Sequence, residues 1–122
     1  MNKLLKDYVQ FLVDDSDLIT QFGTPLIQAR VSDAEREFVT NTDVIKAIKK
    51  FRVSEISLQT FVDWVNTLWF VDSLFVYRDD QIDSIASVMD LLEELDEEGV
   101  TYTDDEYNRM ITALESNAVF IK

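Results

Sequence analysis

The sequence predicts an all-α fold, an irregular helical bundle of about five to six helices that forms a single domain over residues 1–122. The chain has only two glycines and one proline, which is few for the many tight turns of an all-β protein. Apolar residues recur at helical spacing, and capping residues precede most of these runs. Hydrophobic residues make up 47% of the chain, enough for a core without disulfides or metals.

The N-terminal third carries three helix signals. A helix is predicted over residues 3–13, with one apolar face made of Leu5, Tyr8, Val9 and Leu12. A shorter helix is predicted over residues 17–22, because a glycine such as Gly23 commonly follows the last turn. Pro25 after Thr24 favours a further helix start, since proline is preferred at the first helical position.

Three capping signals organise the middle of the chain. Ser32 and Glu35 have the spacing of a capping box, and Thr42 is predicted to cap a helix that carries a basic cluster near its end, made of Lys46, Lys49, Lys50 and Arg52. Ser57 is predicted to cap the next helix. Ile56 and Phe61, on either side of it, have the spacing of a hydrophobic staple.

The segment from residue 58 to 77 is rich in aromatic side chains. Core packing is the favoured interpretation, because aromatic rings bury large areas. An exposed tryptophan, either Trp64 or Trp69, could anchor an interface. These rings are Phe61, Trp64, Trp69, Phe70, Phe75 and Tyr77. The pattern leaves open whether this helix continues through Leu74 or breaks near Asp72.

Two helices are predicted in the C-terminal part. One runs over residues 80–98 and ends before Gly99. The last begins at a capping box formed by Thr103 and Glu106, ends near Asn117, and is followed by a docked tail over residues 118–121. Its inward positions are Tyr107, Met110, Ile111 and Leu114.

Charge is distributed very unevenly along the chain. The net charge is -13, with eight bases against nine acids in residues 1–61 and three bases against fifteen acids in residues 62–122. The stretch from Asp79 to Glu106 contains twelve acids and no base. We therefore describe the protein as one helical domain with an acidic C-terminal half. The basic cluster is expected to pack near acids of its own fold, or of a symmetry mate, rather than to bind phosphate.

The predicted helix over residues 80–98 places four acids on one stripe, opposite its apolar side: Asp83, Asp90, Glu94 and Glu97. A solvated face would normally mix both signs, since opposite charges four residues apart stabilise a helix. Acids crowded at a helix C-terminus are unfavourable, because that end already carries partial negative charge. Sequences often depart from such helix charge preferences at functional sites. We therefore interpret this surface as a binding site for a cationic partner.

The residue inventory disfavours an enzyme. The chain has no Cys and no His, which removes thiol catalysis, Ser–His triads and the usual zinc ligands. Glu94 and Glu97 resemble half of the carboxylate set with which magnesium-dependent nucleotide pyrophosphohydrolases hold their metal, but the second element is missing because Ala118 stands three residues after Glu115. We expect no catalytic residue, cofactor or metal site.

No stretch of the sequence reads as a secretory signal or as a membrane span. We therefore expect a cytoplasmic protein. Its negative charge disfavours direct binding to anionic membranes and to nucleic acid.

The C-terminal pattern resembles a known group. Residues 56–64 read as a capped aromatic helix, and residues 82–85 and 91–99 lead to the capped last helix. Over roughly residues 55–115 this order is similar to that of acidic, helical immunity proteins of nuclease toxins, in particular the colicin D-type and contact-dependent inhibition families. The resemblance implies an inhibitor that binds a transfer-RNA-cleaving toxin domain and covers its active site. It supplies no individual contact residue.

The charge argument supplies the candidate partner-binding residues: Asp83, Asp90, Glu93, Glu94, Glu97, Glu98, Tyr102, Asp104 and Asp105. The expected partner is a basic toxin or nuclease protein. A DNA mimic and a regulatory adaptor stay open as alternatives, because their electrostatics would be similar. A symmetric homodimer with acids spread over a long surface would favour mimicry, whereas a compact monomer with one acidic patch would favour immunity.

Overall fold

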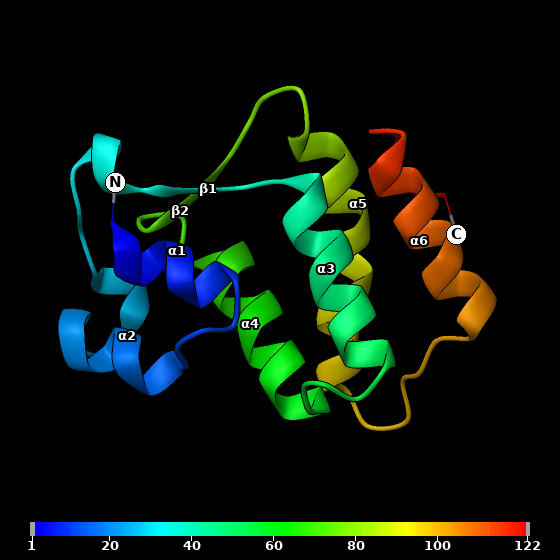
Figure 1. The fold of residues 1–122 in the computed structure, drawn as a ribbon, viewed down its shortest axis with the longest axis horizontal. Coiled ribbons are helices and arrows are strands. Elements are labelled where there is room, and N and C mark those ends of the chain that lie inside the picture. Colours follow the sequence, from blue (N-terminus) through cyan, green and yellow to red (C-terminus); the bar gives the residue numbers. More distant parts are fainter. Residues whose placement is uncertain (1, 122) are drawn as a thin grey trace.

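A computed structural model describes residues 2–121 and confirms the mostly helical fold (Figure 1). The α-helices of the described chain are α1 (Lys3–Val9), α2 (Asp15–Phe22), α3 (Asn41–Arg52), α4 (Leu58–Phe70), α5 (Ile82–Leu92) and α6 (Asp104–Glu115). Short 3₁₀ helices lie at η1 (Leu26–Gln28), η2 (Asp33–Glu35) and η3 (Glu93–Asp96), and two strands at β1 (Glu37–Val39) and β2 (Phe75–Tyr77).

A small parallel sheet joins distant parts of the chain. β1 pairs with β2, and Glu37, Phe38 and Val39 lie opposite Phe75, Val76 and Tyr77, respectively. The sequence analysis did not predict this sheet, because three residues are too few to show the alternation that identifies a strand. The strands place the α1–α2 end of the molecule beside the bundle formed by α3, α5 and α6 (Figure 1).

The first helix is shorter than predicted. α1 ends at Val9, and the chain reverses at Phe11, whose φ of 63° lies in the left-handed region. The Phe11 ring then stacks on Trp64 with the ring centroids 5.2 Å apart. Leu5, Tyr8 and Val9 are buried as predicted, but Leu12, which was expected on the same face, is 72% exposed.

Two of the predicted caps are displaced. Thr40, rather than Thr42, caps α3 through a capping box with Asp43. Ser32 and Glu35 frame only the 3₁₀ turn η2, without a side-chain cap. Pro25 likewise precedes a 3₁₀ turn, η1, instead of an α-helix.

The caps of the later helices are confirmed. Ser57 accepts a hydrogen bond from the Thr60 amide at the start of α4, and α4 ends before Asp72. Thr103 and Glu106 form the predicted capping box of α6. The tail is docked, since the Phe120 amide donates to Ser87 Oγ at 2.8 Å and the Phe120 ring is buried.

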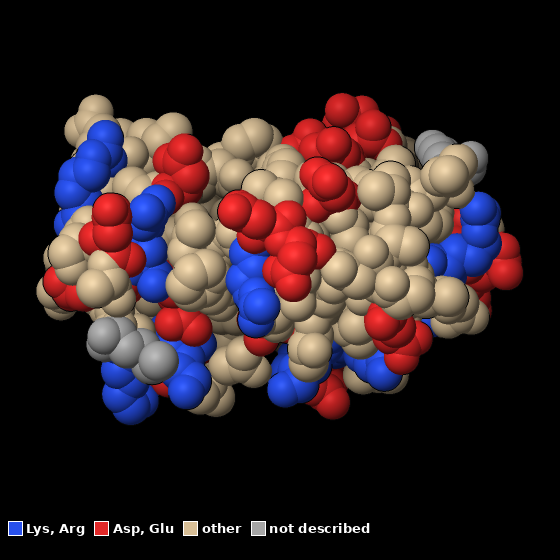
Figure 2. Space-filling view, turned by 90° about the horizontal axis from the view of Figure 1, so that it is seen from above, with Lys and Arg blue, Asp and Glu red and all other residues tan. Residues whose placement is uncertain are grey.

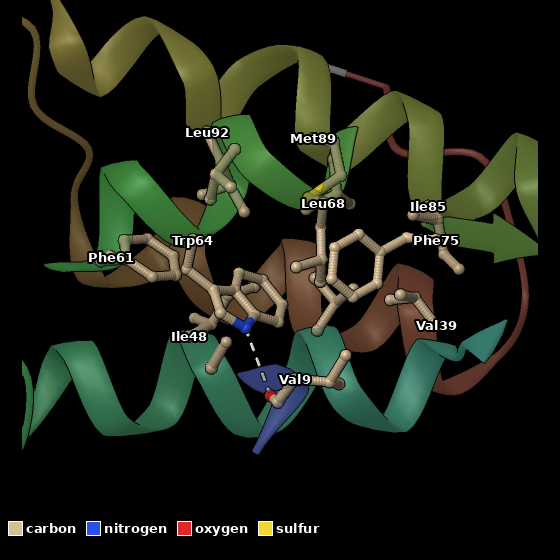
Figure 3. Close-up of a cluster of buried hydrophobic side chains, with 14 of the residues drawn as sticks. Val9, Val39, Ile48, Phe61, Trp64, Leu68, Phe75, Ile85, Met89 and Leu92 are labelled. Carbon is tan, nitrogen blue, oxygen red and sulfur yellow. Dashed lines mark hydrogen bonds between the residues drawn. The ribbon is translucent and has the colours of Figure 1, made fainter. Parts of the chain in front are cut away.

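The core is a cluster of apolar side chains from every layer of the bundle, centred on α4 (Figure 3). Trp64 is 1% exposed, and its indole N–H donates to the Val9 carbonyl at 3.2 Å. Phe61 and Phe75 are also buried, as the sequence predicted. Neither tryptophan is exposed, since Trp69 is half-buried, and the outward ring of this helix is Phe70, at 53% exposure.

A polar network fastens the ends of α3, α5 and α6. Asn117, at φ 53°, accepts from Asn41 Nδ2 at 2.9 Å and donates its own Nδ2 to the Asp80 carbonyl at 2.6 Å. The Asn41 amide donates to Gln81 Oε1 at 3.1 Å. This network fixes the start of α5, and therefore the direction in which its acidic face points.

Candidate functional site

The acidic segment is built on α5, whose apolar side is anchored in the core. Ile85, Val88, Met89 and Leu92 are fully buried, so Asp83 and Asp90, on the opposite side, are exposed. The helical rise of about 1.5 Å per residue separates Asp83 from Glu93 by about 15 Å along the axis. Most acids of this segment therefore form two groups, one at each end of α5, and the exposed Asp90 lies on the helix between them.

The predicted single helix over residues 80–98 is wrong in its last third. α5 ends at Leu92, η3 continues to Asp96, and Glu97 has an extended backbone with ψ 138°. The turn tightens because Leu95 packs into the core with only 6% exposure. The continuous stripe therefore includes Asp83 and Asp90, but the α-helical spacing no longer fixes the direction of the Glu97 side chain.

The first acidic group lies where the chain enters α5. It contains Asp79, Asp80 and Asp83, all of which are exposed. Figure 2 looks down on this end of the molecule and shows acidic side chains gathered across the middle of the face, with basic side chains mainly toward its ends and lower edge.

The second acidic group lies at the far end of α5 and continues into the start of α6. It contains Glu93, Glu94, Asp96, Glu97, Glu98, Asp104 and Asp105. All except Glu93 and Glu94 are exposed. We call this group the acidic end. It holds six of the nine candidate partner-binding residues from the sequence analysis.

Internal ion pairing leaves most of this charge uncompensated. Among the described acids from Asp79 to Asp105, the ion pairs are Arg78–Asp80 at 3.3 Å and Arg52–Asp104 at 3.5 Å. The carboxylate of each pair is exposed, and such pairs typically contribute little to stability. Of the basic cluster, Arg52 pairs with this acidic segment, whereas Lys50 pairs with Glu55, outside the segment, at 3.3 Å. Two of the four residues of the cluster therefore pair with acids of this protein.

Tyr102 holds the loop between η3 and α6 against the acidic end. Its hydroxyl lies 2.6 Å from the Leu91 carbonyl and 3.1 Å from Glu94 Oε2, and can donate to either oxygen. Burial and the adjacent Glu94 carboxylate raise the pKa of the Tyr102 hydroxyl. The ring packs edge-on against Tyr107, with centroids 5.9 Å apart. Tyr102 therefore positions Glu94 and leaves part of its ring for a partner.

Glu93 differs from the other candidates because it is turned partly inward. Its Oε2 atom is buried without a hydrogen-bond partner among the described residues. Burial raises the pKa of Glu93, and so do the neighbouring charges of Asp90, Glu94 and Glu97. Burial, together with the neighbouring carboxylates, therefore opposes ionisation of Glu93.

An apolar hollow of about 370 Å³ adjoins the acidic end. Its lining includes Phe51, Leu58, Leu95, Tyr102 and Tyr107, with Arg52 and Asp104 at its polar edge. Leu58 is 48% exposed, and Val53, in the same connection between α3 and α4, is 67% exposed. A largely apolar centre with a charged rim is the usual anatomy of a protein–protein interface. The sequence analysis missed the contribution of α3 and α4, because only the fold brings them beside residues 95–107.

In residues 2–121, no three acidic side chains converge as a metal-binding group. None of the described helices is long and apolar enough to cross a membrane. A comparison with known proteins gave no matching family model, no matching curated protein and no matching solved structure.

Proposed function

We propose that this chain is an immunity-type inhibitor that binds and covers a cationic toxin domain of the nuclease class, with a transfer-RNA-cleaving domain as the specific expectation. The observation that carries the proposal is the segment from Asp79 to Glu106, with twelve acids and no base. Among the described acids from Asp79 to Asp105, the ion pairs involve Asp80 and Asp104. Such a surface attracts a basic protein and repels nucleic acid.

The proposed mechanism combines steering with coverage. A nuclease presents Lys and Arg side chains to bind phosphate, and the acidic end offers carboxylates to the same groups. Long-range attraction speeds the encounter. The hollow beside Tyr102 and Tyr107 then supplies the apolar contact that slows dissociation, because binding energy concentrates in buried aromatic anchors. The bound inhibitor occupies the groove that the RNA substrate needs.

The carboxylates of the acidic end lower the stability of the protein when no partner is bound. Asp96 is in the last turn of η3, and no basic residue occupies that turn, so its carboxylate faces the negative end of the helix dipole. A structural role would favour lysine here. Binding to a positive partner removes the repulsion, which is a physical reason to maintain this arrangement. An inhibitor of this kind acts where the toxin cuts RNA, so we place it in the cytoplasm.

Co-expression tests the proposal. The gene adjacent to that of this chain should encode a protein with a small basic C-terminal domain, which is expressed alone and together with this chain. We expect the domain to arrest growth and degrade RNA when alone, and this chain to restore growth. The proposal is wrong if no adjacent gene encodes such a domain, or if the chain neither restores growth nor binds the domain at low salt.

A matched pair of variants locates the protective surface. Glu94→Lys with Glu97→Lys reverses two charges at the acidic end and should abolish protection. Asp72→Lys with Glu115→Lys makes the same change in net charge at exposed positions outside it and should preserve protection. Equal behaviour of the two double variants would show that net charge alone, or another surface, is responsible.

A further inference from the structure

A second hollow lies in the N-terminal half, away from the acidic end. It has a volume of about 500 Å³ and opens between residues 11–17 and the first half of α4. Its lining includes the partly exposed ring of Phe11, which stacks on the buried Trp64 with an interplanar angle of 22°. Leu12, Val13 and Ile56 complete the apolar lining. We call it the α1–α4 hollow.

The chain adopts an unfavourable backbone conformation to form this hollow. Phe11 is not a glycine, yet its φ is 63°, which costs about 1 kcal/mol for a residue with a Cβ. The turn puts the Phe11 ring on Trp64 and directs Leu12 outward, where it is 72% exposed. A continued helix would instead have brought Leu12 to the apolar face. Local strain of this kind often accompanies binding sites.

All of the charged side chains that line the α1–α4 hollow are acidic. Asp14, Asp15, Asp17 and Asp63 line it, and no Lys or Arg does. Their described hydrogen-bond donors are neutral. Gln59 Nε2 donates to Asp63 at 2.8 Å, and the Tyr8 hydroxyl donates to Asp15. Asp14 and Asp17 accept from each other's backbone amides in the capping box of α2.

These neutral donors satisfy the carboxylates without cancelling their charge. The pKa of Asp15 is therefore raised above its ordinary value. Burial raises its pKa, and the charges of Asp63 and Asp14 raise it further, against the hydrogen bond from Tyr8, which lowers it. A cation entering the hollow would relieve this repulsion.

We propose that the α1–α4 hollow receives an arginine side chain of a partner protein. An arginine stem is apolar and can lie along Leu12 and Ile56. The guanidinium group is planar, stacks on aromatic faces and hydrogen-bonds carboxylates in a forked geometry. A lysine ammonium is more strongly hydrated and makes no such stack, so the partly exposed Phe11 ring favours arginine.

The connection between α3 and α4 separates the two hollows. Ile56 lines the α1–α4 hollow, whereas Ser54 and Leu58 line the hollow at the acidic end. A protein seated on the acidic end can therefore reach the second hollow across this short segment. The arginine site does not depend on the toxin assignment, because its own residues define its ligand chemistry.

A titration of the full ¹⁵N-labelled chain with Nα-acetyl-arginine amide tests the site. We expect saturable NMR shifts at the Trp64 indole N–H and at the amides of Val13 and Thr60. Nα-acetyl-citrulline amide, which has the same shape without the charge, should shift them far less. The inference is overturned if citrulline acts equally, if the shifts map to residues 93–105, or if Trp64 does not respond at the highest soluble concentration.

Paired substitutions separate a specific site from general charge attraction. Asp15→Asn with Asp63→Asn keeps both hydrogen-bond acceptors and should weaken arginine binding by about tenfold, the equivalent of about 1.4 kcal/mol. Asp33→Asn with Asp72→Asn removes the same charge outside the hollow and should leave binding unchanged. Equal weakening by the two pairs would reject the hollow as the site. Failure here would leave the Glu94 and Glu97 test unaffected, so the two proposals can fail separately.

Discussion

Replacing Asp96 by lysine should stabilise the fold and weaken partner binding at the same time. Asp96 is exposed and is the last residue of η3, a turn without a basic side chain. Removing an acid from the negative end of a helix gains about 0.3–1 kcal/mol, and a cation there gains a similar amount. Lysine would also lie three residues after Glu93, which adds about 0.2–0.5 kcal/mol.

Solvent screening reduces the sum at an exposed site, so we expect Asp96→Lys to stabilise the protein by about 1 kcal/mol. For a domain of this size that corresponds to an increase in Tm of about 3–5 °C. Asp96→Asn should give about half the effect, since it removes the acid without adding a cation. Urea unfolding followed by tryptophan fluorescence measures both, with an unchanged m-value as evidence that only stability has changed.

The salt dependence decides whether the reasoning is right. The gain from Asp96→Lys should be largest at low ionic strength and should shrink as added salt screens the carboxylates. A variant that is no more stable than the parent at low salt, or a gain that salt does not alter, would show that the acidic end carries no mutual repulsion. Association with the basic partner should slow in the same variant, because the steering field is weaker.

Three further substitutions test the structural account. Asp15→Asn should raise stability at neutral pH, since burial raises the folded-state pKa of Asp15 and the ionised carboxylate opposes folding as pH rises through that pKa. The gain in stability should vanish in acid. Asp15→Ala should be about 1–3 kcal/mol less stable than Asp15→Asn, because it leaves the Tyr8 hydroxyl without its acceptor. Chemical denaturation across pH would detect both effects, and a gain that persists in acid would contradict the first. Asn117→Gly should destabilise the protein by about 1–3 kcal/mol through the lost hydrogen bonds to Asn41 and Asp80. Asn117→Ala should cost about 1 kcal/mol more, because residue 117 has a positive φ. Thermal unfolding ranks the two variants, and equal stabilities would mean that no backbone strain exists there. Thr103→Ala should cost about 1 kcal/mol by removing the cap of α6, which urea unfolding would show, and an unchanged midpoint would mean that the capping box contributes nothing.

The helical parts of the fold were predictable where capping and periodicity agreed. Ser57 and Thr103 mark the starts of α4 and α6 because each side chain closes a bond to a nearby amide, which is local chemistry. The buried positions of α6 follow the helical repeat for the same reason. Thr42 failed as a cap because Thr40 forms the capping box with Asp43, and the local pattern favours both threonines almost equally.

Features that depend on distant contacts were not visible in the sequence. α1 stops early because the Phe11 ring finds Trp64, which lies 53 positions later in the chain. The sheet joins segments on either side of α3 and α4. In the candidate site, the concentration of acids was predictable from composition. Its division between the two ends of α5, the inward turn of Glu93 and the apolar hollow all follow from packing.

Near-surface electrostatic potentials, measured at individual residues, test most directly the claim that the acidic end carries uncompensated negative charge. Paramagnetic relaxation of backbone amides by a cationic and an anionic nitroxide reports the local electrostatic potential without any partner. The account predicts that the amides of residues 93–105, together with those of residues 79–83, have the most negative potentials in the C-terminal half, well below those of residues 46–50. Potentials at the acidic end no more negative than those around the lysines of α3 would contradict it.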